Sequence, residues 1–270
     1  MININISTKK FWKKYRDNNL KIWIKGYIYS HTIDKIIDIC KDIKKDEVSS
    51  FLKSIDGHFA LVVQKDDLTF LAVDKIRSTP LFFTKIKNKF FIDYDPKNLV
   101  KLTEFDKTTN QNANLQVSMS GFTIGNGTIY KNLKALKAGE TVLINDNNFK
   151  YLHYFKYFSK IVNKNFDDYL EELSEVTLNI FHKMLNQIGD RQIIIPLSAG
   201  NDSRLVASVL KHLGAKNVKC YSYGTKGNFE AKIAKIIANK LGYEWKFIPL
   251  THKSEKKFYA SDEFKSYLDY

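Results

Sequence analysis

Small residues, hydroxyls and one carboxylate gather in a single short stretch of this sequence, IPLSAGNDS at residues 195–203. The small side chains at 198–200 let backbone N–H groups come close to a ligand. Asp202 and Ser203 then begin an amphipathic run, and the N-terminus of such a helix carries partial positive charge. The stretch therefore suits a phosphate, although ordinary strand-to-helix connections in α/β proteins use the same residue types.

Asp202 is the side chain in this stretch with the chemistry of a cation ligand. Mg²⁺ takes hard oxygen ligands and binds beside polyphosphates, so Asp202 could hold magnesium on a bound nucleotide. The alternative is an acidic residue that stabilises the first turn of the helix by its charge. The stretch is no Walker A loop, because no Gly-Lys-Ser/Thr ending follows Gly200.

The segments around this stretch alternate between strand and helix patterns. Strand patterns occur at 193–197, 218–223 and 245–250, with helical patterns between them at 204–213 and 231–241. This alternation implies right-handed βαβ units and a parallel sheet. Ligands bind at the carboxyl ends of the strands in such sheets, which is where the small-residue stretch would lie.

Two further features belong to this second region. The second strand ends at Tyr221-Ser222-Tyr223-Gly224, beside the end of the first strand, so Tyr223 could flank the base of a nucleotide. Upstream, one apolar stripe at helical spacing predicts a helix of about five turns. The stripe consists of Phe166, Tyr169, Leu170, Leu173, Val176, Ile180, Phe181, Met184 and Leu185.

The first 160 or so residues are rich in strand patterns. Alternating and β-branched runs predict strands at 21–30, 57–64, 68–74, 80–86, 90–92, 140–144 and 149–155, and helical spacing predicts short helices at 33–40 and 48–55. We expect the strands from 57 to 92 to form one β-meander. The polar segment 103–114 predicts a loop.

Composition limits the possible classes of protein. The chain has 270 residues and a formal net charge of +14, but its lysines are scattered and only four of its 43 basic residues are arginines, which disfavours a nucleic-acid-binding surface. Neither a signal peptide nor an apolar run of the ~20 residues that span a membrane is present. Cys40 and Cys220 are too few for a disulfide framework, so we expect free thiols and a cytoplasmic protein.

Several motifs together resemble the asparagine synthetase family. LSAGNDS with its following helix, YSYG, and FEAKIAKIIANKLGYEWKFIPL look like the SGGxDS pyrophosphatase-loop domain of these enzymes. LKSIDGHFALVVQKDDLTFLAVDKIRSTPLFF and GTIYKNLKALKAGETVLI resemble segments of their N-terminal glutaminase domain. The resemblance covers nearly the whole chain.

The resemblance implies a fold and two domains. Residues 1–162 would form an α+β, Ntn-type antiparallel β domain like a class II glutamine amidotransferase. Residues 163–270 would form an incomplete α/β parallel-sheet domain of the pyrophosphatase-loop, adenine nucleotide alpha hydrolase-like class.

The resemblance also implies an activity and a site. Such enzymes bind ATP with Mg²⁺, transfer AMP to a substrate carboxylate, and form an amide when ammonia from glutamine attacks the acyl-adenylate. The residues that would line the phosphates and Mg²⁺ are Leu197, Ser198, Gly200, Asp202 and Ser203, with Asp202 as the Mg²⁺ ligand and Tyr223 at the adenosine. Ala199 replaces the first loop glycine, which ATP binding should tolerate unless that position needs φ > 0.

The N-terminal region departs from the family pattern. Ile2 stands where the family has its cysteine nucleophile, and Lys25-Gly26-Tyr27 replaces the Asn-Gly-Glu segment that helps to hold glutamine. We therefore expect no glutamine nucleophile and no glutamine hydrolysis. A degenerate amidotransferase domain joined to a working adenylating domain is the pattern of the β-lactam synthetase branch, in which the amine does not come from glutamine.

The second departure is at the C-terminus, because family members continue past the third parallel strand whereas this sequence ends at Tyr270. We expect a fragment, a split subunit or a degraded gene product, with a small-molecule carboxylate as substrate and a complementing C-terminal chain or a homo-oligomer as partner. Two alternatives to ATP-dependent amide formation stay open. One is a non-catalytic interaction or scaffold module derived from such an enzyme, and the other is a tRNA-modifying pyrophosphatase-loop enzyme.

Overall fold

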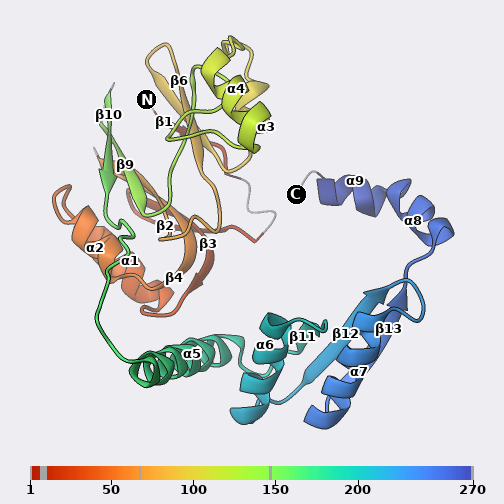
Figure 1. The fold of residues 1–270 in the computed structure, drawn as a ribbon. Coiled ribbons are helices and arrows are strands. Elements are labelled where there is room, and N and C mark those ends of the chain that lie inside the picture. Colours follow the sequence, from red (N-terminus) through yellow and green to blue (C-terminus); the bar gives the residue numbers. More distant parts are fainter. Residues whose placement is uncertain (1, 7–10, 67, 146–147, 269–270) are drawn as a thin grey trace. The chain divides into compact units, whose positions relative to one another are not determined.

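The computed structural model describes residues 2–6, 11–66, 68–145 and 148–268. The chain divides into two compact units, Met1–Lys160 and Ile161–Tyr270 (Figure 1), compared with the expected division after residue 162. The expected antiparallel sheet in the first unit and the expected parallel sheet in the second are confirmed. Among the described residues no helix has the length and apolar character needed to cross a membrane.

A six-stranded antiparallel sheet and two helices make up much of the first unit. Its strand order is β10-β9-β5-β4-β3-β2. The bounds are β2 (Lys13–Asp17), β3 (Leu20–Ile28), β4 (Gly57–Lys65), β5 (Leu68–Val73), β9 (Glu140–Asn145) and β10 (Asn148–His153), with α1 (Ile33–Asp42) and α2 (Val48–Ser54) between β3 and β4. Both helices were predicted from their apolar spacing, and Thr32 caps α1 by accepting a hydrogen bond from the Lys35 N–H.

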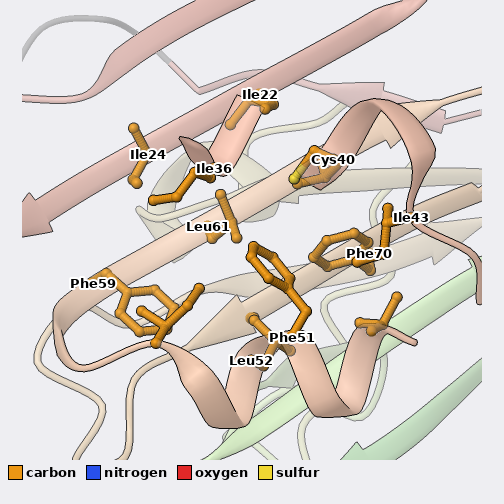
Figure 2. Packing of buried hydrophobic residues seen from close by; sticks show 14 of the residues in the cluster. Ile22, Ile24, Ile36, Cys40, Ile43, Phe51, Leu52, Phe59, Leu61 and Phe70 are labelled. Carbon is orange, nitrogen blue, oxygen red and sulfur yellow. The ribbon is translucent and has the colours of Figure 1, made fainter. Parts of the chain in front are cut away.

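Strand β4 lies at the centre of this unit and is buried on both faces. Phe59, Leu61 and Val63 pack in the cluster that joins the sheet to α1 and α2, where Figure 2 shows Phe59 and Leu61. Ala60 and Val62 point to the opposite face, into the core between this sheet and a second one. All five side chains are at most 1% exposed, so the pleat of one strand supplies two separate hydrophobic cores.

The second sheet of this unit has the order β1-β7-β6-β8. Its strands are β1 (Ile2–Ile4), β6 (Phe82–Ile86), β7 (Lys89–Asp93) and β8 (Leu133–Ala135), and β1 runs parallel to β7 whereas the other pairs are antiparallel. The expectation of one continuous β-meander from 57 to 92 is therefore wrong. The hairpin β4–β5 belongs to the first sheet and the hairpin β6–β7 to the second.

Asp74 is the residue at which the chain leaves the first sheet for the second. Its fully buried carboxylate accepts hydrogen bonds from the backbone N–H groups of Phe59 at 3.0 Å, Ile76 at 2.9 Å and Ser78 at 3.0 Å. The Ser78 hydroxyl donates a fourth, at 2.6 Å. These bonds fix a local turn at 74–78 that redirects the chain, and a simple hairpin would not need them.

The predicted loop at 103–114 is also partly wrong, because helix α4 (Gln111–Ser120) begins inside it. Asn110 caps this helix, with its side-chain oxygen accepting from the N–H of Asn112 at 3.1 Å. Most of the apolar side chains of α4 remain exposed, Met119 among them at 79%. A helix without an apolar stripe has no periodic signal, which is why its polar sequence resembled a loop.

The short helix α3 (Pro96–Val100) packs over β6 and β7.

The second unit contains a three-stranded parallel sheet, and its helices between residues 166 and 241 pack on one face of that sheet. Its elements are α5 (Phe166–Ile188), β11 (Ile193–Pro196), α6 (Asn201–His212), β12 (Val218–Gly224), α7 (Phe229–Leu241), β13 (Glu244–Pro249), α8 (His252–Tyr259) and α9 (Asp262–Leu268). The order β11-β12-β13 places the end of β11 beside β12, as predicted. Ile195, Cys220 and Ala234 belong to the covered core, whereas Ile194 and Tyr223 are each 60% exposed on the opposite face.

Candidate functional site

Leu197 continues the sheet one residue beyond β11 and anchors the loop that follows. Its N–H donates to the Tyr221 carbonyl at 2.8 Å, and its own carbonyl accepts from the buried Ser222 hydroxyl at 2.6 Å. Trp245 Nε1 donates to the same hydroxyl at 3.0 Å. Because both backbone polar groups of Leu197 are used and its side chain is buried, it holds the start of the loop in place.

The loop between β11 and α6 is tied together by its own serines. The Ser198 hydroxyl accepts from the Gly200 N–H at 3.1 Å and lies 3.0 Å from the Ser203 hydroxyl. The Ser198 N–H also donates to Ser203 Oγ, at 3.1 Å. Two hydroxyls predicted to line a phosphate site thus lie next to each other at the turn.

The backbone of this loop is free of left-handed strain. Within the described residues, Ala199 is absent from the non-glycine positions that have positive φ, and Gly200 has φ −71°. Alanine therefore fits the place where the family has glycine. A Cβ added at Gly200 would lie only 3.2 Å from Ser198 Oγ, so the small size of this residue, rather than its backbone freedom, matters here.

Helix α6 starts directly at the loop, and its first turn carries two charged side chains. Gly200 is its N-cap and supplies no side-chain cap, which leaves the first-turn N–H groups to solvent or a ligand. Asp202 is exposed and, in the part of the chain that the structure describes, has no side-chain hydrogen bond or ion pair. Arg204 folds back over the loop, with Nη2 at 2.5 Å from Asn201 Oδ1 and 3.5 Å from the Ala199 carbonyl.

Tyr223 lies near the carboxyl end of β12, the strand next to β11. Its exposed ring stacks on Tyr221, with ring centroids 6.3 Å apart. This position is compatible with a contact to a bound base, which stays a prediction.

Sequence reasoning did not assign a role at this site to Ser222, Trp245 or Arg204. The signal for Ser222 was its place between two tyrosines of a predicted strand. There the alternation of side chains points its hydroxyl inward, where a polar group needs a hydrogen-bond partner. The signal for Arg204 was its position as a cationic residue immediately after the small-residue stretch.

The chemistry of the loop fits a magnesium nucleotide. N–H groups at a helix start and two hydroxyls suit phosphate oxygens, and one uncommitted carboxylate suits a cation. Among the described residues no cluster of three or more His, Cys, Asp or Glu side chains could hold a metal by itself. Mg²⁺ commonly binds through one or two carboxylates together with phosphate oxygens and water, so Asp202 beside a phosphate is the arrangement that this loop offers.

The first unit contains no accessible thiol among its described residues. Cys40 is fully buried between α1 and the six-stranded sheet (Figure 2), and burial raises the pKa of its thiol to about 12. A neutral, buried thiol is a poor nucleophile. Ile2, which stands where the family has its cysteine nucleophile, lies in β1 opposite Phe90 of β7.

Gly26, in the segment that departs from the family pattern, has φ +104° in β3. A Cβ at this position would lie 1.9 Å from the His58 carbonyl oxygen. This glycine therefore permits the close approach of β3 and β4, a structural role that requires no ligand.

Comparison with known families supports the resemblance in both units. Residues 43–156 match the family model described as a glutamine amidotransferase domain, and residues 185–255 match the one described as asparagine synthase. The second match includes the whole loop from Leu197 to Ser203. The two matches occur in the order that the resemblance implies, which confirms the resemblance for these two segments.

Two solved structures show a distant similarity. One is a glutamine phosphoribosylpyrophosphate amidotransferase from B. subtilis complexed with ADP and GMP, at 14% identity and TM-score 0.35, covering 91% of this chain and 52% of that one. The other is described as the allosteric regulatory enzyme of purine biosynthesis, at 12% identity and TM-score 0.33, covering 91% and 51%. This chain thus spans about half the length of each. No curated protein matches it.

Proposed function

We propose that this chain, which joins a glutamine amidotransferase-like segment to an asparagine synthase-like segment, binds Mg-ATP and serves ATP-dependent amide formation through an acyl-adenylate. The observation that carries the proposal is the loop between β11 and α6, which lies inside the asparagine synthase match. It presents two hydroxyls, helix N–H groups and an uncommitted carboxylate at the carboxyl edge of a parallel sheet.

The proposed roles follow from these positions. The hydroxyls of Ser198 and Ser203 and the N–H groups of the first turn of α6 hold the phosphates, and Asp202 holds Mg²⁺. Tyr223 contacts the adenosine. Bound Mg²⁺ would neutralise charge on the phosphates during adenylation, and preorganised N–H donors contribute to the same effect.

The proposed activity does not use glutamine. Cysteine is the nucleophile in the glutaminase domain that the first unit resembles, and the unit's one cysteine, Cys40, is buried with a raised pKa. The amine would come from the substrate or from free ammonia. The first unit would then have a structural or regulatory role, and a complementing chain or second copy would supply groups that act on the carboxylate.

Isothermal titration calorimetry of the full chain with Mg-ATP tests the nucleotide claim. Wild-type protein should bind with measurable heat, and Asp202→Ala should bind Mg-ATP at least about tenfold more weakly, because it loses a charged ligand. Asp190→Ala removes an exposed carboxylate near the start of β11, outside the loop, and is the matched control that should bind like wild type. Absence of heat with wild-type protein would reject the proposal.

Incubation with glutamine tests the claim about ammonia. No glutamate above the rate of spontaneous hydrolysis should form, with or without Mg-ATP. Stoichiometric labelling of the protein by a glutamine-analogue electrophile would contradict this expectation.

A further inference from the structure

Two charges in the first turn of α6 lack ionic partners among the described residues. Asp202 has no hydrogen bond or ion pair through its side chain. Arg204 contacts the amide oxygen of Asn201 and the Ala199 carbonyl, both of them neutral. Residues two apart on a helix do not face each other, and these two opposite charges form no ion pair with one another in the described structure.

The guanidinium of Arg204 is positioned over the loop rather than away from it. Its contacts with Ala199 and Asn201 place it against the segment that the nucleotide proposal assigns to phosphates. It is also the one cationic side chain in the segment 197–204. A planar guanidinium that is held by neutral oxygens can exchange them for phosphate oxygens, with which it forms stronger, charge-assisted and often bidentate hydrogen bonds.

We infer that Arg204 is a phosphate-binding residue of this loop, contacting the terminal part of the triphosphate that leaves as pyrophosphate. The inference rests on the proposed function and assigns separate roles to the two charged residues of the loop. Asp202 serves the cation, and Arg204 pairs with phosphoryl oxygens. In the absence of nucleotide, the guanidinium donates hydrogen bonds to Asn201 Oδ1 and the Ala199 carbonyl instead.

A purely structural role makes a different prediction. If Arg204 served only to brace the loop through Asn201, then removing either partner of that hydrogen bond should have the same effect. If Arg204 binds phosphate, removing Asn201 should leave binding unchanged or slightly stronger, because the guanidinium is released from a competing contact.

The experiment is calorimetric titration of the full chain with Mg-ATP and, separately, with magnesium pyrophosphate. The variants are Arg204→Ala, Arg204→Lys, Asn201→Ala and the control Lys232→Ala, which removes an exposed cation from the first turn of α7. We expect Arg204→Ala to weaken both ligands by roughly 10- to 100-fold, since hydrogen bonds between charged groups have that effect. Arg204→Lys should lose less, and Asn201→Ala and Lys232→Ala should bind like wild type.

Three results overturn the inference and leave the nucleotide proposal intact. They are unchanged binding by Arg204→Ala, equal losses in Arg204→Ala and Asn201→Ala, and an equal loss in Lys232→Ala that would indicate only a general effect of charge. Failure of wild-type protein to bind Mg-ATP rejects the proposed function itself. Circular dichroism of each variant distinguishes loss of binding from loss of folding.

Discussion

At the scale of single residues, the two units of this chain differ in which reactive groups are accessible. In the second unit Asp202 and Arg204 lie exposed at the start of α6, without ionic partners in the described structure. In the first unit the reactive group, the Cys40 thiol, is enclosed by apolar side chains. Of these groups, the exposed ones therefore lie at the loop of the second unit, for which nucleotide binding is proposed.

Thiol chemistry provides a test at this scale. Both cysteines are buried, and burial raises the pKa of Cys220 as well as that of Cys40. With a pKa of about 12 for Cys40, only about one thiol in ten thousand is ionised at pH 8. We expect no rapid reaction of the native protein with a disulfide reagent at pH 8, and two reactive thiols after unfolding in guanidinium.

The Cys220→Ala variant isolates the thiol of Cys40. A fast-reacting thiol in this native variant at pH 8 would contradict the buried position of Cys40. The sign of the linkage gives a second readout. The folded thiol keeps its proton up to about pH 12 whereas the unfolded thiol ionises near its ordinary value of 9.0, so the free energy of unfolding should fall as the pH rises above 9.

At the scale of elements, local patterns predicted helices and strands well where one face is apolar. Helices α1 and α2 and the alternation of strands and helices after residue 193 follow from apolar spacing alone. Helix α4 has no apolar stripe and was missed. The buried turn at Asp74 determines where the chain passes from one sheet to the other. No local pattern encodes this turn, because one of the hydrogen-bond donors to Asp74 is the distant Phe59 N–H.

The candidate site divides in the same way. The loop itself could be predicted, because small residues and hydroxyls at a strand end are a local pattern. The anchoring of Leu197 by Ser222 and Trp245 could not, because it joins three strands that only the folded sheet brings together. The approach of Arg204 to the loop depends on a side-chain conformation, which the sequence does not encode locally.

The pairing of β3 with β4 gives a prediction for an element. Gly26 and Gly125 both have positive φ, at +104° and +77°, but a Cβ at Gly26 would meet the His58 carbonyl at 1.9 Å whereas nothing lies within 4 Å at Gly125. Gly125→Ala should cost about 1–2 kcal/mol, the penalty for a left-handed alanine. Gly26→Ala should cost more than about 4 kcal/mol, because the strands must separate to accommodate the methyl group.

Urea unfolding measures this difference. Trp12 and Trp23 are buried in the first unit and report its unfolding by fluorescence, in a Trp245→Phe background that removes the signal of the second unit. Equal losses of stability in the two alanine variants would show that backbone strain alone matters, and would remove the close-approach explanation for Gly26.

At the scale of the whole molecule, the chain consists of two units with separate cores and separate family matches. The first unit buries its strands in two hydrophobic layers, one on each side of β4. The second leaves apolar surface exposed, including Leu173 on α5 at 64% and Ile194 on the sheet at 60%. The expected complementing chain or second copy stays a prediction, whereas the loop and its neighbouring strands all belong to the second unit.

Because the loop proposed to bind nucleotide lies wholly in the second unit, Mg-ATP should protect only that unit from hydrogen exchange. Backbone N–H groups that donate to phosphate exchange more slowly, and a ligand at 100 times its Kd stabilises the state that binds it by about 2.7 kcal/mol. Exchange measured by mass spectrometry on the full chain should therefore slow by at least severalfold in peptides covering 197–206 and the end of β12. Peptides from β4 and β5 should exchange at the same rate with and without nucleotide, and Asp202→Ala should show little protection anywhere.

Protection confined to the first unit would place the nucleotide outside the loop. Equal protection in both units would show that the cores are coupled and that the first unit responds to ligand bound by the second.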